Sequence, residues 1–328
     1  MHSIRVRNVN HAFREAFYFM RAAGKMETSR NGKVLVLDEP FATTYTRPQE
    51  RVLFNPLRDA NGVFHLMEAI WMMAGRNRVE WLLPFNKSFG QYAEDDGKAH
   101  GAYGARWWGL SDASGQPQLF GVLELLRKDP NTRRAVLQMW DSERDMGAAK
   151  RDLPCNTHIY FDCRGDQLNM TVCNRSNDML WGAYGANAVH MSFLQEWMAS
   201  YLHMPLGRYT QFSNNFHLYT DLPQVQAFLD TPPTRDYDFY QQGTTSALPL
   251  VGPGEDASMF LKDCQDMCSD GDGVLRTVFM SRVANPLRMA YLARKANQPY
   301  KDIVDRIPNC DWKLAFQQWC DRREEVQA

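Results

Sequence analysis

Cys155 is the first residue whose position suggests chemistry. It stands in the run Leu153-Pro154-Cys155-Asn156, directly after a proline and just before a predicted strand. Proline fixes the backbone, so the cysteine lies at a rigid turn where its side chain can be aimed. Arg175 falls at the end of the hairpin that begins with this strand, and a nearby guanidinium favours the nucleophilic thiolate. The spacing indicates a nucleophile, although most cysteines are structural.

Glu68 is the second candidate, because it lies in a helix predicted over 63–74 that is otherwise apolar almost all round. Ionised carboxylates are rarely buried without partners. One interpretation is a salt bridge or an exposed helix edge. The other is an acid–base group with a raised pKa in a cleft.

Three further polar groups fit a ligand, but each also has an ordinary structural explanation. Arg133 and Arg134 precede a predicted strand and suit a phosphate clamp, or they form a solvated strand end. The polar segment 174–187 offers groups that can read a polar ring, or it caps the next helix. His217 and Tyr219 are two apart on a strand and share a face, where they bind a sugar hydroxyl or bond within the core.

The elements that must position these residues are mixed helices and strands. Hydrophobic periodicity and turn residues predict helices over 10–23, 63–74, 119–127, 186–202, 259–267 and 311–323. The strands are expected over 33–37, 135–140, 158–163, 169–173 and 209–218. A long loop with an ordered core is expected over 95–115 and a surface loop over 243–256. Because no regular βαβ alternation is present, the class is α+β. No convincing boundary divides the chain, so residues 1–328 form a single expected domain.

Composition excludes several classes of function. The 37 basic and 38 acidic residues leave a net charge of −1, which argues against a nucleic-acid or membrane-surface binder. No apolar run approaches a membrane helix, and the N-terminus lacks the pattern of a signal peptide, so we expect a cytoplasmic protein. The seven cysteines include no Cys-x-x-Cys pair. Cys264 and Cys268 are interpreted as buried apolar fillers in a helix, and no metal is expected.

Seven motifs in order resemble a known family. They are Ser29-Arg30-Asn31-Gly32, the Glu68 helix ending in Trp71 and Gly75, Gly101-Ala102-Tyr103-Gly104, Thr132-Arg133-Arg134, Leu153-Pro154-Cys155, Arg175-Ser176-Asn177-Asp178 and His217-Leu218-Tyr219. The chain resembles thymidylate synthase and its relatives, the pyrimidine nucleotide hydroxymethylases, over about 8–219. Residues 220–328 are interpreted as a divergent part of the same domain. The resemblance implies a mixed sheet covered by helices, in a homodimer with shared active sites.

The resemblance also implies a role for each matching residue. Cys155 adds to C6 of a pyrimidine nucleoside monophosphate, Glu68 organises water and relays protons, and Tyr103 lines the site. The substrate is bound by Arg30, Arg175 and Ser176 at the phosphate, by Arg133 and Arg134 from the partner subunit, by Asn187 at the base, and by His217 and Tyr219 at the sugar. Asp178 and Trp81 contact the cofactor, 5,10-methylenetetrahydrofolate.

Three departures from the family pattern bear on the product. Asn156 replaces the usual His after the nucleophile. The segment 182–187 replaces Gly-x-Pro-Phe-Asn with one residue more, so Asn187 stands one residue late. The charged ending 319–328 does not resemble the apolar tail that closes over the folate. Methyl transfer must exclude water, whereas hydroxymethyl transfer must admit it.

These departures favour a dUMP 5-hydroxymethylase. The alternatives are a thymidylate synthase, a dCMP or CMP 5-hydroxymethylase, and a non-catalytic binding relative. An asparagine after the phosphate loop reads uracil in this family and an aspartate goes with cytosine, so Asn187 favours dUMP.

Overall fold

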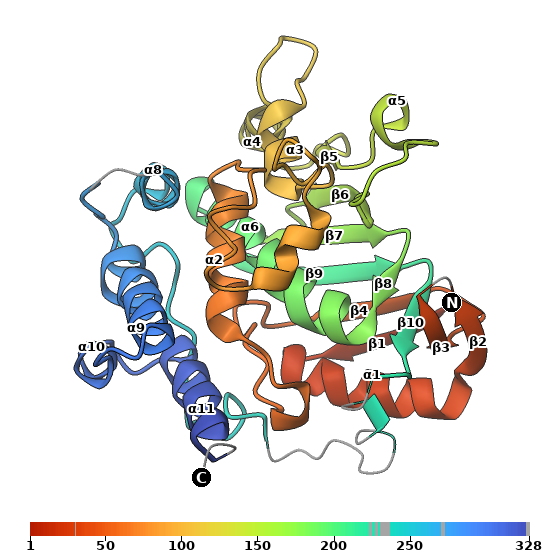
Figure 1. Cartoon of the computed structure of the whole chain (residues 1–328). Helices are drawn as coiled ribbons and strands as arrows, with labels where there is room; N and C mark the ends of the chain where they lie inside the picture. The colour runs from red at the N-terminus through yellow and green to blue at the C-terminus, as the bar shows by residue number, and fades with distance from the viewer. Residues whose placement is uncertain (30, 223–224, 227–228, 230–236, 270–272, 326–328) are drawn as a thin grey trace.

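The computed structural model describes residues 1–328 except 30, 223–224, 227–228, 230–236, 270–272 and 326–328 (Figure 1). Among the described residues, six strands form a mixed sheet in the order β1 (His2–Val6), β4 (Phe41–Tyr45), β9 (Leu206–Ser213), β7 (Leu168–Asn174), β6 (Asn156–Asp162) and β5 (Val136–Gln138). Four more form a second sheet in the order β2 (Lys25–Ser29), β3 (Gly32–Val36), β10 (Phe216–Tyr219) and β8 (Asn177–Asp178).

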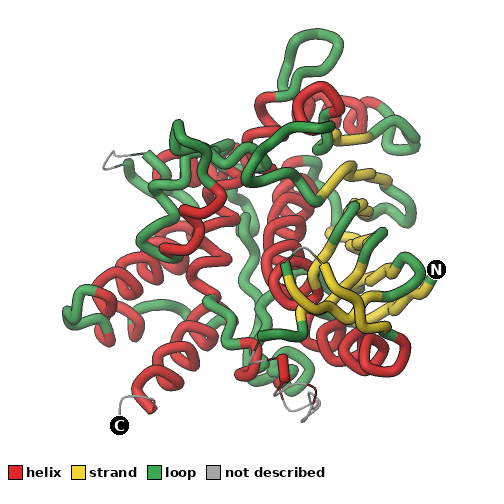
Figure 2. Tube along the Cα trace, turned by 45° about the vertical axis from the view of Figure 1, so that its right-hand side comes forward, coloured by secondary structure: helices red, strands yellow, loops and turns green. Residues whose placement is uncertain are grey.

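Helices α1 (Val9–Ala23), α2 (Gly62–Met73) and α6 (Asn187–Tyr201) form the central helical layer. α1 packs on β1 and β4, and α6 packs on β7, β9 and α2. The outer side of α2 meets α8 (Ala257–Met267), α9 (Asn285–Lys295) and α11 (Asp311–Glu325). Both α2 and α6 therefore lie between other elements, which explains why their sequences are apolar almost all round. Figures 1 and 2 place the α9 and α11 helices far from the second sheet.

Shorter helices complete the described chain. They are η1 (Pro56–Arg58), η2 (Lys87–Tyr92), α3 (Tyr103–Gly109), α4 (Gln118–Lys128), α5 (Ser142–Asp145), η3 (Met179–Ala186), η5 (Met280–Ala284) and α10 (Lys301–Asp305). η3 has π-helical hydrogen bonding and leads directly into α6. None of the helices described is both long and apolar enough to cross a membrane.

One face of the six-stranded sheet is open in the single chain. Register places one row of side chains across that face: Val136, Tyr160, Thr171, Thr210 and Thr44. Val136 and Tyr160 are 37% and 44% exposed, whereas their strand neighbours Leu137 and Ile159 are fully buried on the helical side. The described helices of one chain therefore cover one face of this sheet and leave the row at Val136 and Tyr160 exposed.

The α+β class is confirmed, and the six predicted helices correspond to α1, α2, α4, α6, α8 and α11. The loop predicted over 95–115 is wrong, because it contains α3. Gly104 suggested a loop, but a Cβ there would lie 1.9 Å from the Met72 carbonyl oxygen. The glycine is needed because α3 packs against the backbone of α2.

The single strand predicted over 209–218 is also wrong. It breaks between β9 and β10 because the Asn214 amide donates to Asn174 O at 2.8 Å, while Asn215 O accepts from Asn177 N at 2.9 Å. These bonds carry the chain from the first sheet into the second. β1, β2, β4 and α9 were not predicted.

Candidate active site

A cavity of about 570 Å³ lies between the second sheet and the loop that ends at Cys155. Five of the residues singled out from the sequence lie in its wall: Cys155, Arg175, Ser176, His217 and Tyr219. A cavity of this volume is within the usual range for a small-molecule site.

The backbone around Cys155 is held from two sides. The amides of Cys155 and Asn156 donate to Tyr103 Oη at 3.3 and 3.4 Å, and Cys155 O accepts from Arg175 N at 2.9 Å. Burial, and next the negative charge of a Cys155 thiolate, raise the pKa of Tyr103. Its phenol therefore stays protonated and fixes the turn that presents the half-buried Cys155 thiol.

Arg175 binds the same turn through its side chain. Its Nε donates to Pro154 O at 3.0 Å and its Nη2 to Leu153 O at 3.2 Å, and the guanidinium lies over the Trp140 ring. The arginine therefore shapes the loop before the thiol and also supplies positive charge to the cavity.

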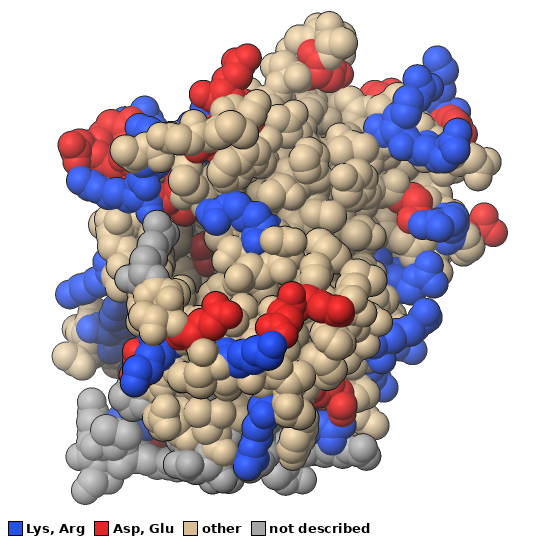
Figure 3. All heavy atoms as spheres, turned by 90° about the vertical axis from the view of Figure 1, so that its right-hand side faces the viewer, with Lys and Arg blue, Asp and Glu red and all other residues tan. Residues whose placement is uncertain are grey.

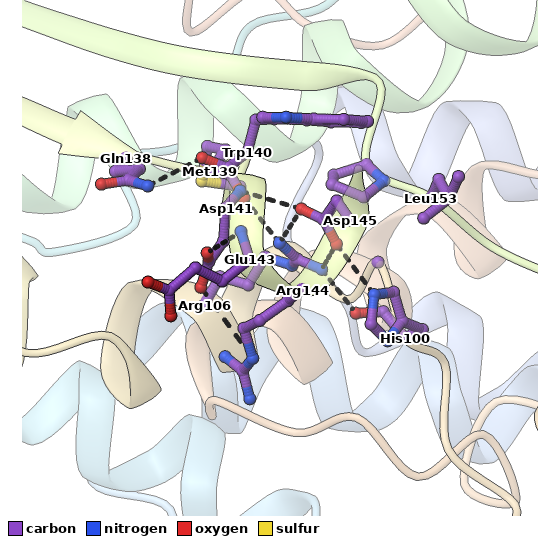
Figure 4. A network of polar contacts seen from close by, with 12 residues as sticks. His100, Arg106, Gln138, Met139, Trp140, Asp141, Glu143, Arg144, Asp145 and Leu153 are labelled. Atoms are coloured by element: carbon purple, nitrogen blue, oxygen red, sulfur yellow. Dashed lines mark hydrogen bonds and ion pairs between the residues drawn. The ribbon is translucent and has the colours of Figure 1, made fainter. Parts of the chain in front are cut away.

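A buried ion pair anchors the segment that leads to this loop (Figure 4). Arg106 on α3 donates to both Asp145 oxygens at 2.6 and 2.7 Å, and His100 Nε2 lies 2.8 Å from Asp145 Oδ1. Burial alone would raise the pKa of Asp145, but hydrogen bonds from Arg106, Asp141 N and His100 outweigh it and lower the pKa to about 2. The carboxylate is ionised at neutral pH and ties 139–145 to α3.

Sequence analysis missed other residues of the cavity wall, among them Asp152, Lys150 and Arg151. Asp152 Oδ2 accepts from Gly101 N at 3.1 Å, and burial raises the pKa of Asp152. A Cβ on Gly101 would lie 2.7 Å from that oxygen, which explains the glycine of the Gly101-Ala102-Tyr103-Gly104 motif. The position of these residues next to recognised motifs was the available signal.

Basic and acidic side chains are interspersed on the face that Figure 3 shows, where the N-terminal side of the molecule is turned to the viewer. This scatter agrees with the net charge of −1. The cavity wall holds the cations Lys150, Arg151 and Arg175 together with the acidic Glu27 and Asp152. Arg151 Nη2 is paired with Asp95 at 2.7 Å, which leaves Lys150 and Arg175 as the cations best placed for a small anion.

His217 and Tyr219 lie side by side on β10, with ring centroids 5.2 Å apart. His217 Nδ1 lies 2.8 Å from Asn215 Oδ1, and Tyr219 Oη accepts from Asn31 Nδ2 at 3.4 Å. Burial lowers the pKa of His217, against the opposing effect of the Asp178 charge. The neutral imidazole and the phenol present hydrogen-bonding atoms to the cavity.

Behind the cavity a chain of buried amides runs from the nucleophile loop into the core. Asn156 Nδ2 donates to Asn187 Oδ1 at 3.4 Å, and Asn187 Nδ2 donates to Asn177 Oδ1 at 3.1 Å. Asn177 in turn donates to Gln211 and Ser213. Asn187 is thus connected to the residue that follows Cys155, although Asn187 is not among the residues that line the cavity.

Glu68 lies on α2 with its side chain 13% exposed, and its Oε2 is 3.2 Å from Nε2 of His190 on α6. His190 is a further residue that was not predicted, because a histidine within an apolar helix gives no separate signal. The pair stands where α2 and α6 pack together.

The two residues expected at the cofactor lie outside the cavity wall. Asp178 Oδ1 accepts from Trp181 N at 2.6 Å, while its buried Oδ2 has no hydrogen-bond partner among the described residues. Burial raises the pKa of Asp178. Trp81 is partly buried and packs on Phe85 at 5.6 Å between ring centroids.

Two of the expected phosphate ligands, Arg133 and Arg134, do not line the cavity of the described chain. Both are exposed in the segment before β5. Arg30 lies outside the described residues.

The family model described as thymidylate synthase matches residues 58–238, just over half of the chain. The chain belongs to the thymidylate synthase family, which confirms the resemblance drawn from the motifs and agrees with the α+β arrangement. It is 40% identical to the deoxyuridylate hydroxymethyltransferase of Pseudomonas phage M6, across 98% of this chain and 95% of that relative.

Two further relatives are similar over part of their length. A deoxyuridylate hydroxymethyltransferase of Bacillus phage SP01 is 35% identical over 58% of this chain and 52% of that protein. A thymidylate synthase of Corynebacterium aurimucosum is 27% identical over 52% of this chain and 63% of that protein.

Proposed function

We propose that this protein is a dUMP 5-hydroxymethylase that uses 5,10-methylenetetrahydrofolate and the Cys155 thiolate. The observation that carries the proposal is the position of Cys155 in a cavity wall together with Arg175, Ser176, His217 and Tyr219. The similarity to a deoxyuridylate hydroxymethyltransferase across nearly both whole chains supports the choice of substrate and product.

The chemistry explains why a thiolate is needed. C5 of uracil is a poor nucleophile until Cys155 adds to C6 and forms an enolate. The bound folate supplies a carbon at the oxidation level of formaldehyde. Once C5 has bonded to this carbon and lost its proton, cleavage of the bond between the carbon and the folate nitrogen would give the exocyclic methylene and free tetrahydrofolate. Water then adds to the methylene, and the thiolate leaves C6.

The remaining side chains suit the other parts of the ligands. Arg175 and Lys150 supply positive charge for a phosphate, and His217 and Tyr219 offer polar atoms for the sugar. The unpaired Asp178 Oδ2 is a buried acceptor that fits an N–H group of the pterin.

A homodimer is part of the proposal. A second copy would cover the open sheet face that carries Val136 and Tyr160. Arg133 and Arg134 stand exposed next to β5, at the edge of that face, from which they would reach the partner's phosphate.

Thymidylate synthase is the second candidate, favoured by the family model and by the Corynebacterium relative. Against it, the relative that matches across nearly both whole chains is a deoxyuridylate hydroxymethyltransferase. A dCMP or CMP hydroxymethylase would need a differently fixed amide or a carboxylic acid at Asn187. A binding relative would have no use for the thiol.

Product analysis tests the proposal. The protein is incubated with methylenetetrahydrofolate and dUMP, dCMP or CMP, and we expect the mass of 5-hydroxymethyl-dUMP. A methyl product, or a preference for a cytosine nucleotide, would contradict it.

The Cys155→Ala variant should abolish release of tritium from C5-labelled dUMP while nucleotide binding stays within about tenfold, because the phosphate and sugar contacts remain. Cys173→Ala is the matched control, since Cys173 is equally half-buried but does not line the cavity. Tritium release at the wild-type rate by Cys155→Ala would remove the assignment.

A further inference from the structure

His190 and Glu68 form a polar contact inside the apolar packing of α6 against α2. The His190 side chain is 2% exposed, and its Nε2 lies 3.2 Å from Glu68 Oε2. The direction of approach does not make a hydrogen bond, so this nitrogen has no hydrogen-bond partner among the residues that the structure describes. A nitrogen and an oxygen placed in this way can both reach a third polar atom.

Further buried polar side chains continue from His190 and Glu68 to the nucleophile loop, and together they form a polar strip. Asn187 precedes His190 by three residues on α6, so both side chains lie on one helix face. Asn187 accepts from Asn156, the residue after Cys155, and Asn156 Oδ1 is also buried without a described partner. Unpaired buried polar atoms cost about 1–3 kcal/mol each, so two of them along one strip indicate a small polar ligand.

Water is the ligand that fits such a strip, because it makes two to four hydrogen bonds to buried polar groups. Glu68 is the proton acceptor of the strip. The nearby His65 cannot compete, because burial, then Arg58 and His190, lower its pKa well below the ordinary value.

We infer that His190 and Glu68 hold the water molecule that becomes the hydroxyl of the product. This inference rests on the proposed function and names the residues that perform its last chemical step. His190 Nε2–H donates to the water oxygen, and the Glu68 carboxylate faces its proton.

The water oxygen bonds to the exocyclic methylene carbon, its proton passes to Glu68, and the electron pair of the methylene double bond moves to the enolate. The enolate then expels the Cys155 thiolate from C6 and restores the double bond between C5 and C6. His190 positions the water and forms no covalent bond.

Thiol trapping separates this step from the earlier ones. Wild type, His190→Ala and His190→Gln are mixed with C5-tritiated dUMP and methylenetetrahydrofolate in a single turnover, with and without 2-mercaptoethanol. In His190→Ala we expect tritium release within about threefold of wild type, hydroxymethyl product reduced by about tenfold or more, and the thioether adduct of dUMP increased. His190→Gln keeps an N–H donor and should recover part of the product.

Ser192→Ala is the control on the same helix, because the buried Ser192 hydroxyl donates to the carbonyls of Ala188 and Val189 within its own helix. Unchanged product in both His190 variants, or an equal fall in tritium release and product without extra adduct, would overturn the inference. If His190→Ala does not fold, the test rests on His190→Gln. For this variant we expect less hydroxymethyl product relative to tritium release, and more thioether adduct, than for wild type. Absence of tritium release by wild type would instead refute the proposed function.

Discussion

Asp145→Asn should destabilise the protein and slow the chemistry at Cys155. The asparagine keeps the shape of the side chain but removes the charge that pairs with Arg106. Because Arg106 is only 4% exposed, its guanidinium would remain buried without a carboxylate. The segment 141–154 would then lose the anchor that holds it on α3 (Figure 4).

The size of the effect follows from the pKa of Asp145. Folding lowers the pKa of Asp145 from 3.8 to about 2 through hydrogen bonds from Arg106, Asp141 N and His100. Each unit corresponds to about 1.4 kcal/mol, so the ionised carboxylate and these partners together contribute about 2.5 kcal/mol at neutral pH. Leaving one partner of a buried pair uncompensated costs about 3–5 kcal/mol. We therefore expect the free energy of unfolding to fall by about 3 kcal/mol at pH 7.

The sign of the pH dependence is fixed as well. A carboxyl whose pKa is lower in the folded state stabilises above its unfolded pKa, and this contribution is lost as pH falls from about 4 to 2. The difference between wild type and Asp145→Asn should thus narrow in acid.

Urea unfolding at pH 7 and at acidic pH measures the loss of stability and its dependence on pH. In Asp145→Asn we also expect C5 tritium release to slow about tenfold, because a small displacement of a nucleophile lowers the rate strongly. Asp166→Asn is the control, since Asp166 is exposed in the β6–β7 turn. A change below about 0.5 kcal/mol at pH 7, within the range of surface substitutions, would refute the reasoning.

Three other predictions address assembly, base preference and stability. Inactive Cys155→Ala chains should regain part of the activity when they are mixed with inactive chains that carry both Arg133→Ala and Arg134→Ala. A protein that is monomeric by light scattering and fully active would exclude the shared site. In competition kinetics, Asn187→Asp should reduce or reverse the preference for dUMP over dCMP, a change of about 1–3 kcal/mol. A wild-type preference for dCMP would contradict this prediction. Burial raises the pKa of Asp311 to about 7, so the contribution of this carboxyl to stability falls as pH rises from about 4 to 7. In thermal unfolding, Asp311→Asn should therefore gain stability relative to wild type over this range, and equal slopes for the two proteins would contradict the prediction.

Sequence patterns predicted the elements whose signal is local. Asn8 and Asn61 directly precede α1 and α2 and cap them as their types suggest. The β6–β7 hairpin turns at Gly165 and Asp166 with positive φ angles. β1 was missed because it is short and partly polar, and it pairs in parallel with a strand about 40 residues away. Such a strand is stabilised by its neighbour rather than by its own pattern.

The residues of the candidate site were likewise predicted where their sequence signal is local. Cys155 and Arg175 were recognised because a proline turn and a hairpin bring them together over a short stretch of chain. His190, Asp152 and Asp145 were not recognised, since each depends on a contact between distant elements: His190 with Glu68, and Asp145 with Arg106. A histidine in an apolar helix resembles any core residue until its neighbour is known.

Two of the differences from the family sequence pattern, at Asn156 and at 182–187, lie next to each other in the fold. A π-helical turn accommodates one residue more than an α-helical turn, and η3 occupies the segment where this chain is longer than the family pattern. The extra residue therefore need not displace Asn187, which begins α6 and bonds to Asn156. Asn156 in turn replaces a histidine, while His190 adds an imidazole one helical turn beyond Asn187. The imidazole thus stands beside Glu68 instead of beside the nucleophile, where it can serve water addition rather than the exclusion of water.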